Sequence, residues 1–336
     1  MIKASLNWTF LIVGTVIGAG YASGRELWQF FGPESGLAII LFTFLFAISC
    51  YSIMIISFKK QSEHYAAILS KIVGGKTHKL FDIFIFVYLI ATTVVMVAGS
   101  GAIGEIYDLS SWWGIFLLSI SLVGIFSFNI EGFLSMNKIV IPVLILGLLF
   151  VLISFISVEN VPLMEESAKQ GNWFAAFPFT SLNILPLIAV LGAIGSKIGS
   201  KKEVLLSSMA SGLILGVVTF IYNKSLVHIE EQVDAYEIPL FTILEGYSKP
   251  LFLFVTVMLW LAIFTTAASN MIGIVTRLRE ILDLKFLMIV FLTLLIIVPI
   301  SKIGFSTLIQ YLYPAYGVLN LYILAKLIVY PFIGKG

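Results

Sequence analysis

The sequence predicts an all-α polytopic membrane protein of ten transmembrane helices, arranged as two inverted halves of five. Of the 336 residues, 60% are hydrophobic and only 11% are charged, whereas a soluble domain carries about 25% charged residues. The mean hydropathy is +1.06. The chain has too little charge to cover a water-facing surface, which excludes a soluble enzyme, a nucleic-acid binder and a disordered chain.

Ten apolar windows lie between charged breaks, and a transmembrane helix needs about 20 mostly apolar residues. The expected spans are residues 5–31, 37–58, 80–104, 112–128, 137–157, 177–198, 204–223, 250–276, 286–301 and 304–332. The longest polar connections, 59–79, 158–176 and 224–249, are too short for a soluble domain. We therefore expect residues 1–336 to form a single transmembrane domain, with repeats over about 5–157 and 177–332.

The distribution of Lys and Arg predicts the orientation of the chain. If the N-terminus is cytoplasmic, fifteen of these residues fall on the inner side and four on the outer side. This asymmetry predicts a multi-pass protein of the cell membrane with both termini in the cytoplasm. The outer connections are acidic, and the one at 224–249 carries Glu230, Glu231, Asp234 and Glu237.

Chemically reactive side chains are scarce. Cys50 is the single cysteine, and the three histidines lie in polar connections. No Cys/His cluster has the spacing of metal ligands, and no catalytic constellation is visible. We expect no enzymatic activity.

Each half has five spans, an odd number, so the second half must enter the membrane from the opposite face, as in inverted repeats. A similar string of small residues occurs in the third span of each half, at residues 98–104 and 267–273. Small residues are common in spans, so we place more weight on helix interruptions at matching positions of the two halves.

The first span has four glycines within eleven residues, at positions 14, 18, 20 and 24. Each costs about 1 kcal/mol relative to alanine in a helix interior. The equivalent sixth span contains Pro186, which removes a backbone donor. Gly14/Gly18 and Gly20/Gly24 also fit small-xxx-small helix packing. Because both pairs share one span, we expect broken first and sixth helices whose loose backbone lines a cavity.

At these residues the chain resembles the amino acid–polyamine–organocation superfamily with the leucine-transporter (LeuT) fold, and most of all its YkvI-type amino acid permeases. The resemblance covers the whole chain, and its most specific string is Gly14-Thr-Val-Ile-Gly-Ala-Gly20. Two departures bear on the substrate. The sixth span has Leu185-Pro186-Leu187 where relatives have a glycine cluster, and the Asp-Pro-Gly-Asn motif of divalent-metal relatives is absent. The fifth span also lacks the mid-membrane lysine of proton-coupled relatives.

The resemblance implies a sodium site between the first and eighth spans. The second matching string is Ala262-Ile-Phe-Thr-Thr266. By this resemblance, sodium would contact the carbonyl oxygens of Gly14, Ile17 and Ala262 and the hydroxyls of Thr265 and Thr266. A hard cation suits such oxygen ligands. The alternative is that the two threonines bond the carbonyls of the preceding turn.

Arg25 and Glu26 follow the glycines, on the outer half of the first span. An ionisable pair within a membrane suggests a function, although both side chains could also snorkel to the outer interface. Relatives close an outer gate between an arginine here and an acid of the tenth span. Since the tenth span offers only Gln310 and Tyr311, we expect Glu105 or Glu26 to replace that acid.

The expected substrate is a small neutral amino acid or similar zwitterion, held at the midplane. Free amides after Gly18 would bind the carboxylate, and the sixth-span break near Asn183 and Leu185 would take the ammonium group. The candidate substrate-binding residues are Ile17, Gly18, Ala19, Gly20, Tyr21, Val97, Asn183, Leu185 and Ile188. The substrate pathway could also be lined by three tyrosines of the tenth span, Tyr311, Tyr313 and Tyr316.

Taken together, the residues and the resemblance predict a secondary transporter, with sodium-coupled symport by alternating access. One alternative is an amino-acid-sensing receptor subunit of the same fold, like those of spore germination receptors. The other is a proton-coupled or organic-cation transporter. The expected partners are the small-molecule substrate and the lipid bilayer, with no nucleic acid.

Overall fold

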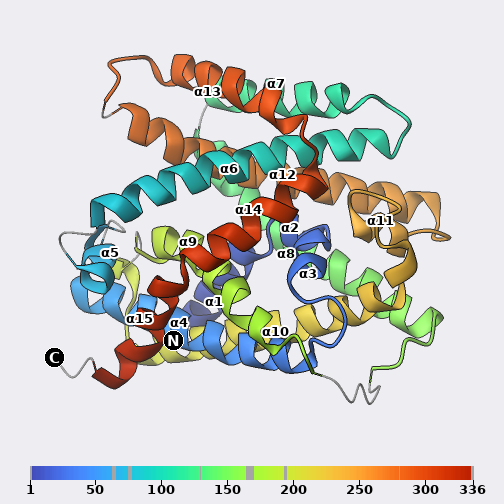
Figure 1. The fold of residues 1–336 in the computed structure, drawn as a ribbon. Helices are drawn as coiled ribbons and strands as arrows, with labels where there is room; N and C mark the ends of the chain where they lie inside the picture. The colour runs from blue at the N-terminus through green and yellow to red at the C-terminus, as the bar shows by residue number, and fades with distance from the viewer. Residues whose placement is uncertain are drawn as a thin grey trace.

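The computed structural model describes residues 2–62, 66–74, 78–128, 130–163, 170–192, 195–279 and 281–333. All regular elements within these ranges are helices (Figure 1). In the first half the helices are α1 (Ile2–Val16), α2 (Ala19–Ala22), α3 (Arg25–Phe30), α4 (Gly36–Lys60), α5 (Ala66–Val73), α6 (His78–Glu105), α7 (Ser111–Phe128) and α8 (Ile130–Val158).

The second half begins with η1 (Trp173–Ala175), a short 3₁₀ helix. The helices that follow are α9 (Ala176–Gly192), η2 (Gly195–Lys197), α10 (Lys201–His228), η3 (Glu230–Gln232), α11 (Pro239–Ile243), α12 (Lys249–Arg279), α13 (Phe286–Ser301), α14 (Phe305–Leu319) and α15 (Leu321–Ile333). Each of the ten expected spans therefore corresponds to one helix or to a group of consecutive helices.

Five of the described helices are individually long and apolar enough to cross a membrane: α4, α6, α9 with η1, α10 and α12. The pair α13 and α14, bent by 104° at its break, brings the number to six if it is one span. The remaining apolar helices, within α1, α7, α8 and α15, are 10–17 residues long. Exposed apolar side chains such as Ile120 on α7 and Ile296 on α13 suit a lipid-facing surface.

The helices form two packed groups, and each group contains helices from both halves of the chain (Figure 1). In one group α4 packs along α10, and α1 packs on both α9 and α10. In the other, α6 packs along α12 and α7 along α13. The packed pairs α4/α10, α6/α12 and α7/α13 occupy equivalent positions in the two halves, as expected for an inverted repeat. An ion pair between Asp82 of α6 and Arg277 of α12 links the second group.

The first span, here called the first segment (α1, α2 and α3), is broken as its glycines predicted, and the structure interrupts it at two points. The α1 helix ends at Val16, where the amide of Gly18 turns back to the carbonyl of Val16 at 2.7 Å. Gly24 then has a φ of 82°, in the left-handed region that favours glycine, and α3 starts in a new direction. Gly18 and Gly24 therefore lie at the two breaks, whereas Gly14 belongs to α1 and Gly20 to α2.

In the sixth segment the position of the predicted break is wrong. The α9 helix runs from Ala176 to Gly192 with Pro186 inside it. Asn183 and Leu185 therefore belong to a regular helix. A proline removes one hydrogen bond, here to the carbonyl of Leu182. Burial along α9 holds the rest of the helix together.

Candidate functional site

The break in the first segment makes backbone N–H and C=O groups available for binding inside the protein. The amide of Ala22 donates to the carbonyl of Gly18 at 2.8 Å, which closes the single turn of α2. Among the described residues, no hydrogen bond reaches the amides of Ala19, Gly20 and Tyr21 or the carbonyls of Gly14 and Ile17. Unpaired backbone groups are costly in a membrane interior unless they line a site. The break therefore offers donors and acceptors to a ligand.

Glu26 lies at this break and not in the outer gate, where we considered it as the acidic partner of Arg25. Its residue exposure is 5%, and its Oε1 atom accepts a hydrogen bond from Asn183 Nδ2 at 3.2 Å. Its Oε2 atom lies 2.8 Å from the point that a Cβ on Gly20 would occupy. Gly20 thus leaves room for the carboxylate. Because the chain turns at Gly24, Glu26 points back toward the break instead of following a straight helix outward.

A tyrosine side chain of the tenth span also lies at this break. The hydroxyl of Tyr313, on α14, lies 3.1 Å from the Cβ position of Gly20. Tyr316 packs edge-to-face on Tyr88 of α6, with ring centroids 5.2 Å apart. Tyr311 is 69% exposed and does not join them. Sequence reasoning missed Tyr88, which lies in a long apolar helix with no motif around it.

Tyr21, expected at the substrate, faces the neighbouring helix α10. Its hydroxyl lies 2.8 Å from that of Thr219 and 3.4 Å from the carbonyl of Leu215. One turn further along α10, the hydroxyl of Tyr222 donates to the carbonyl of Ala22. These contacts attach α2 to α10.

The other apolar candidates belong to the core of the protein. Ile17, Val97, Leu185 and Ile188 are each at most 2% exposed. Of the candidates outside the first segment, Asn183 is the one that contacts it through a described hydrogen bond, by way of Glu26.

The two strings that imply a sodium site lie side by side. The Thr266 hydroxyl is 3.5 Å from the Cβ position of Gly18, so α12 touches the break. The Thr265 hydroxyl donates to the carbonyl of Ala262 at 3.1 Å, which is the alternative role considered for an intramembrane threonine. The oxygen atoms of Thr265 and Ala262 remain close to each other in this arrangement. In the first string, the carbonyls of Gly14 and Ile17 accept no hydrogen bond from the described residues.

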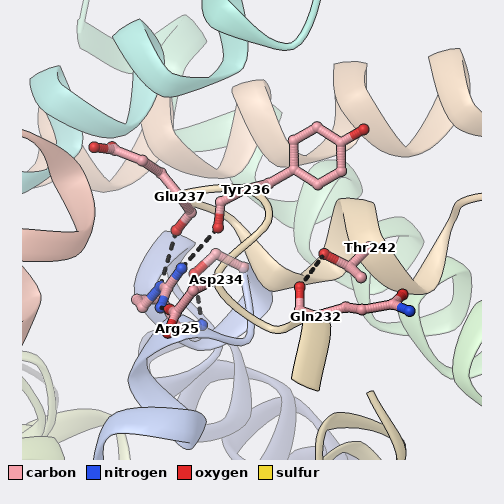
Figure 2. Close-up of polar contacts among 7 residues, drawn as sticks. Arg25, Gln232, Asp234, Tyr236, Glu237 and Thr242 are labelled. Atoms are coloured by element: carbon pink, nitrogen blue, oxygen red, sulfur yellow. Dashed lines mark hydrogen bonds and ion pairs between the residues drawn. The ribbon is translucent and has the colours of Figure 1, made fainter. Parts of the chain in front are cut away.

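Arg25 is bound by the loop between α10 and α12, here called the acidic loop (residues 229–248). Figure 2 shows its guanidinium group enclosed by this loop. The Nη1, Nε and Nη2 atoms donate to Asp234 Oδ1 at 2.5 Å, to the Glu237 carbonyl at 3.0 Å and to the Tyr236 carbonyl at 2.7 Å. The side chain of Arg25 is 6% exposed and that of Asp234 is 78% exposed.

The acid that we predicted as the partner of Arg25 in the outer gate is therefore wrong. Asp234 of the acidic loop pairs with Arg25, whereas Glu105 is exposed at the end of α6 and Glu26 points inward. No sequence signal distinguishes Asp234 from the other acids of its loop. The amide of Leu240 also donates to the carbonyl of Ser23 at 3.0 Å, so the acidic loop holds the first segment through both side chain and backbone.

Glu237 ties the acidic loop to the start of α14. Its Oε2 atom accepts a hydrogen bond from the amide of Phe305 at 2.9 Å, which caps the helix beginning after Gly304. Burial raises the pKa of Glu237 above its ordinary value, and nearby Glu105 adds to the increase, although the hydrogen bond to Phe305 opposes it. One loop thus contacts the first and the tenth segments together.

Two proteins of Bacillus subtilis (strain 168) match the chain over nearly its whole length, although no family model matches it. The uncharacterized protein YyaD is 46% identical over 333 residues, covering 99% of this chain and 98% of YyaD. The uncharacterized membrane protein YkvI is 26% identical over 333 residues, covering 95% of this chain and 94% of YkvI.

Two solved structures share the fold. The inward-facing conformation of Mhp1 matches with a TM-score of 0.64 at 14% identity, over 98% of this chain and 77% of Mhp1. A mutant of the Eremococcus coleocola manganese transporter matches with a TM-score of 0.61 at 14% identity, over 99% and 88% of the two chains. These likenesses establish the LeuT-type fold that the sequence resemblance predicted. The chain therefore belongs to the family of YyaD, with YkvI as a more distant relative, and it is a polytopic membrane protein with the LeuT-type fold.

Proposed function

We propose that this protein is a secondary transporter that carries a small neutral amino acid, or a similar zwitterion, together with a sodium ion. The observation that carries the proposal is the doubly broken first segment. It brings free amides, free carbonyls and a buried carboxylate to one place inside the membrane domain. Such half-helix sites bind substrates and ions in secondary transporters. The proposal needs no covalent chemistry, and the protein is not an enzyme.

The free amides at Ala19 and Gly20 would receive the substrate's carboxylate. Sodium would bind between the break and α12, at Gly14, Ile17, Ala262, Thr265 and Thr266. In the described part of the chain, no group of three or more His, Cys, Asp or Glu side chains could hold a metal ion. At 14% identity the likeness to a manganese transporter is one of fold, and we do not extend it to the cargo.

Alternating access would arise from motion of the group α1, α4, α9 and α10 against the group α6, α7, α12 and α13. The acidic loop closes the side on which we expect the outside of the cell, and Arg25 is its main contact. We place the protein in the cell membrane with both termini in the cytoplasm, as its Lys and Arg distribution predicts.

Counterflow tests this function. Purified protein in proteoliposomes loaded with unlabelled alanine, valine and leucine should accumulate labelled forms of at least one of them, and sodium should stimulate uptake. Protein-free liposomes provide the control. Specific binding of these amino acids without counterflow would contradict transport and favour the receptor alternative.

A further inference from the structure

Glu26 is a buried acid with no described cationic partner. It is 5% exposed, and among the described residues the one side-chain donor that reaches it is Asn183 Nδ2, at 3.2 Å. The ion pairs of the described residues join Arg25 to Asp234 and Arg277 to Asp82, and neither includes Glu26. A buried carboxylate without a countercharge is costly. Either a proton or the positive charge of a ligand must compensate it.

The neighbouring residue does not supply that charge. Arg25 is adjacent in sequence, but its Nε, Nη1 and Nη2 atoms all donate to the acidic loop. Consecutive residues of α3 thus point to different partners, Arg25 to the loop and Glu26 to the interior. Arg25 therefore does not compensate Glu26, and a countercharge other than a proton has to come from a molecule that enters the break.

The two oxygen atoms of Glu26 have different surroundings. Oε1 accepts from Asn183, whereas Oε2 lies beside Gly20, where the amides of Ala19 and Gly20 are free. In an α-amino acid the ammonium and carboxylate groups are attached to the same carbon atom. An ammonium site must then adjoin a carboxylate site, and Oε2 satisfies this condition.

We propose that Glu26 binds the ammonium group of the substrate through Oε2, with Asn183 as the positioning residue that holds Oε1. This inference rests on the proposed function and adds to it a selectivity: the site takes compounds that carry a protonated amine. The ammonium group is thus bound by a side chain of the first segment, where the sequence analysis had assigned it to carbonyl groups of the sixth.

Ligands that carry only the ammonium group or only the carboxylate test the two contacts separately. Alanine, valine and leucine are compared with the amines that lack their carboxylate (ethylamine, isobutylamine and isoamylamine) and with the acids that lack their amine (propionate, isovalerate and 4-methylpentanoate). Binding is measured by calorimetry on the purified full-length protein. We expect amino acids and amines to bind and the acids not to bind.

The Glu26→Gln variant keeps the size of the side chain and an oxygen that can accept from Asn183. It should weaken binding of amino acids and amines by about 100-fold, the effect of losing a charge-assisted hydrogen bond. Glu26→Asp should give an intermediate loss. Glu159→Gln, at an exposed acid after α8, is the matched control and should bind normally. The ligand-free Glu26→Gln protein should melt no lower than the wild type, since it removes an unpaired buried charge.

The outcomes distinguish this inference from the proposed function. If Glu26→Gln binds the amino acids with unchanged affinity while the wild type transports them, the ammonium assignment is wrong and transport stands. If that variant also loses its response to a pH gradient, Glu26 carries a proton instead, which likewise overturns the assignment. If the wild type binds none of the amino acids or amines, the inference and the proposed amino acid substrate both fail.

Discussion

The hydroxyl of Tyr222 donates a hydrogen bond to the carbonyl oxygen of Ala22 at 2.9 Å, which fixes the break of the first segment to α10. The same hydroxyl would lie 2.7 Å from a Cβ atom on Gly24, whose φ is 82°. Gly24 therefore meets two requirements, a left-handed backbone and close contact with a buried ring. The direction of α3 depends on both.

Gly24→Ala should destabilise the protein strongly. The left-handed backbone costs an alanine about 1 to 2 kcal/mol, and overlap with Tyr222 should add about 1 to 3 kcal/mol. Gly246→Ala is the matched control, because Gly246 has the same φ of 82° and no atom within 4 Å of its Cβ position. Thermal melting should show a clearly larger loss for Gly24→Ala. Equal losses would mean that Tyr222 simply moves aside.

Sodium should raise the melting temperature of the wild type, and potassium should not, because a ligand that binds only the native state stabilises it by mass action. Combining Thr265→Val with Thr266→Ala should abolish this increase. Thr293→Val removes a hydroxyl that bonds the preceding turn of α13 and should leave the sodium response intact. A full response in the double variant would place the ion elsewhere.

The contact between Arg25 and the acidic loop should depend more on the arginine than on its acidic partner. Arg25→Ala removes three hydrogen bonds, two of them to backbone carbonyls. Asp234→Ala removes one contact to a side chain that is 78% exposed, and such exposed pairs contribute about 0 to 1 kcal/mol. Hydrogen exchange of residues 229–248 should accelerate markedly in Arg25→Ala and slightly in Asp234→Ala. The reverse order would show that the ion pair itself closes the loop.

Glu237 should make stability depend on pH. Its pKa is raised in the folded protein, mainly by burial, so the folded state holds this proton more tightly than the unfolded state. Its contribution to stability therefore falls as the pH rises from the ordinary value of 4.5 through the raised one. In melting experiments between about pH 4 and 7, Glu237→Gln should lose part of this decline. Glu231→Gln, at an exposed acid of the same loop, should follow the wild type.

Impermeant thiol labelling tests the orientation. Cysteines placed at the exposed positions Gln61 and Gln232, in a Cys50→Ala background, should react from opposite sides of the membrane. Native Cys50 is fully buried, so its removal serves mainly to exclude labelling during partial unfolding. Labelling of both positions from one side would rule out the inverted arrangement.

The sequence predicted the architecture because its main signals are physical costs that a membrane protein must compensate. Four glycines in one apolar span are unfavourable in a helix, and the first segment is broken at Gly18 and again at Gly24. Pro186 is a weaker indication of a helix break than the four glycines. One proline deletes a single hydrogen bond, and the buried α9 helix continues through it.

The positions of the charged side chains were harder to predict. A straight helix places Glu26 about 12 Å beyond Gly18, which led to the expectation of an outer gate. The turn at Gly24 returns the carboxylate to Gly20 instead. The partner of Arg25 is 209 residues away, in a loop of several similar acids. Pattern and spacing do not identify such a partner, because its position depends on how the two halves pack.

The division of the first segment also bears on how the protein enters the membrane during synthesis. The α1 helix has 15 residues, about 22 Å of helix against a hydrocarbon layer of about 30 Å. The buried groups that follow it bond to residues 157 and 209 positions later, Asn183 and Asp234. This segment leaves the ribosome before its partners do, so it cannot reach its final place until the second half has been made. A chain truncated after α8 should leave this segment poorly inserted and open to quality-control proteases.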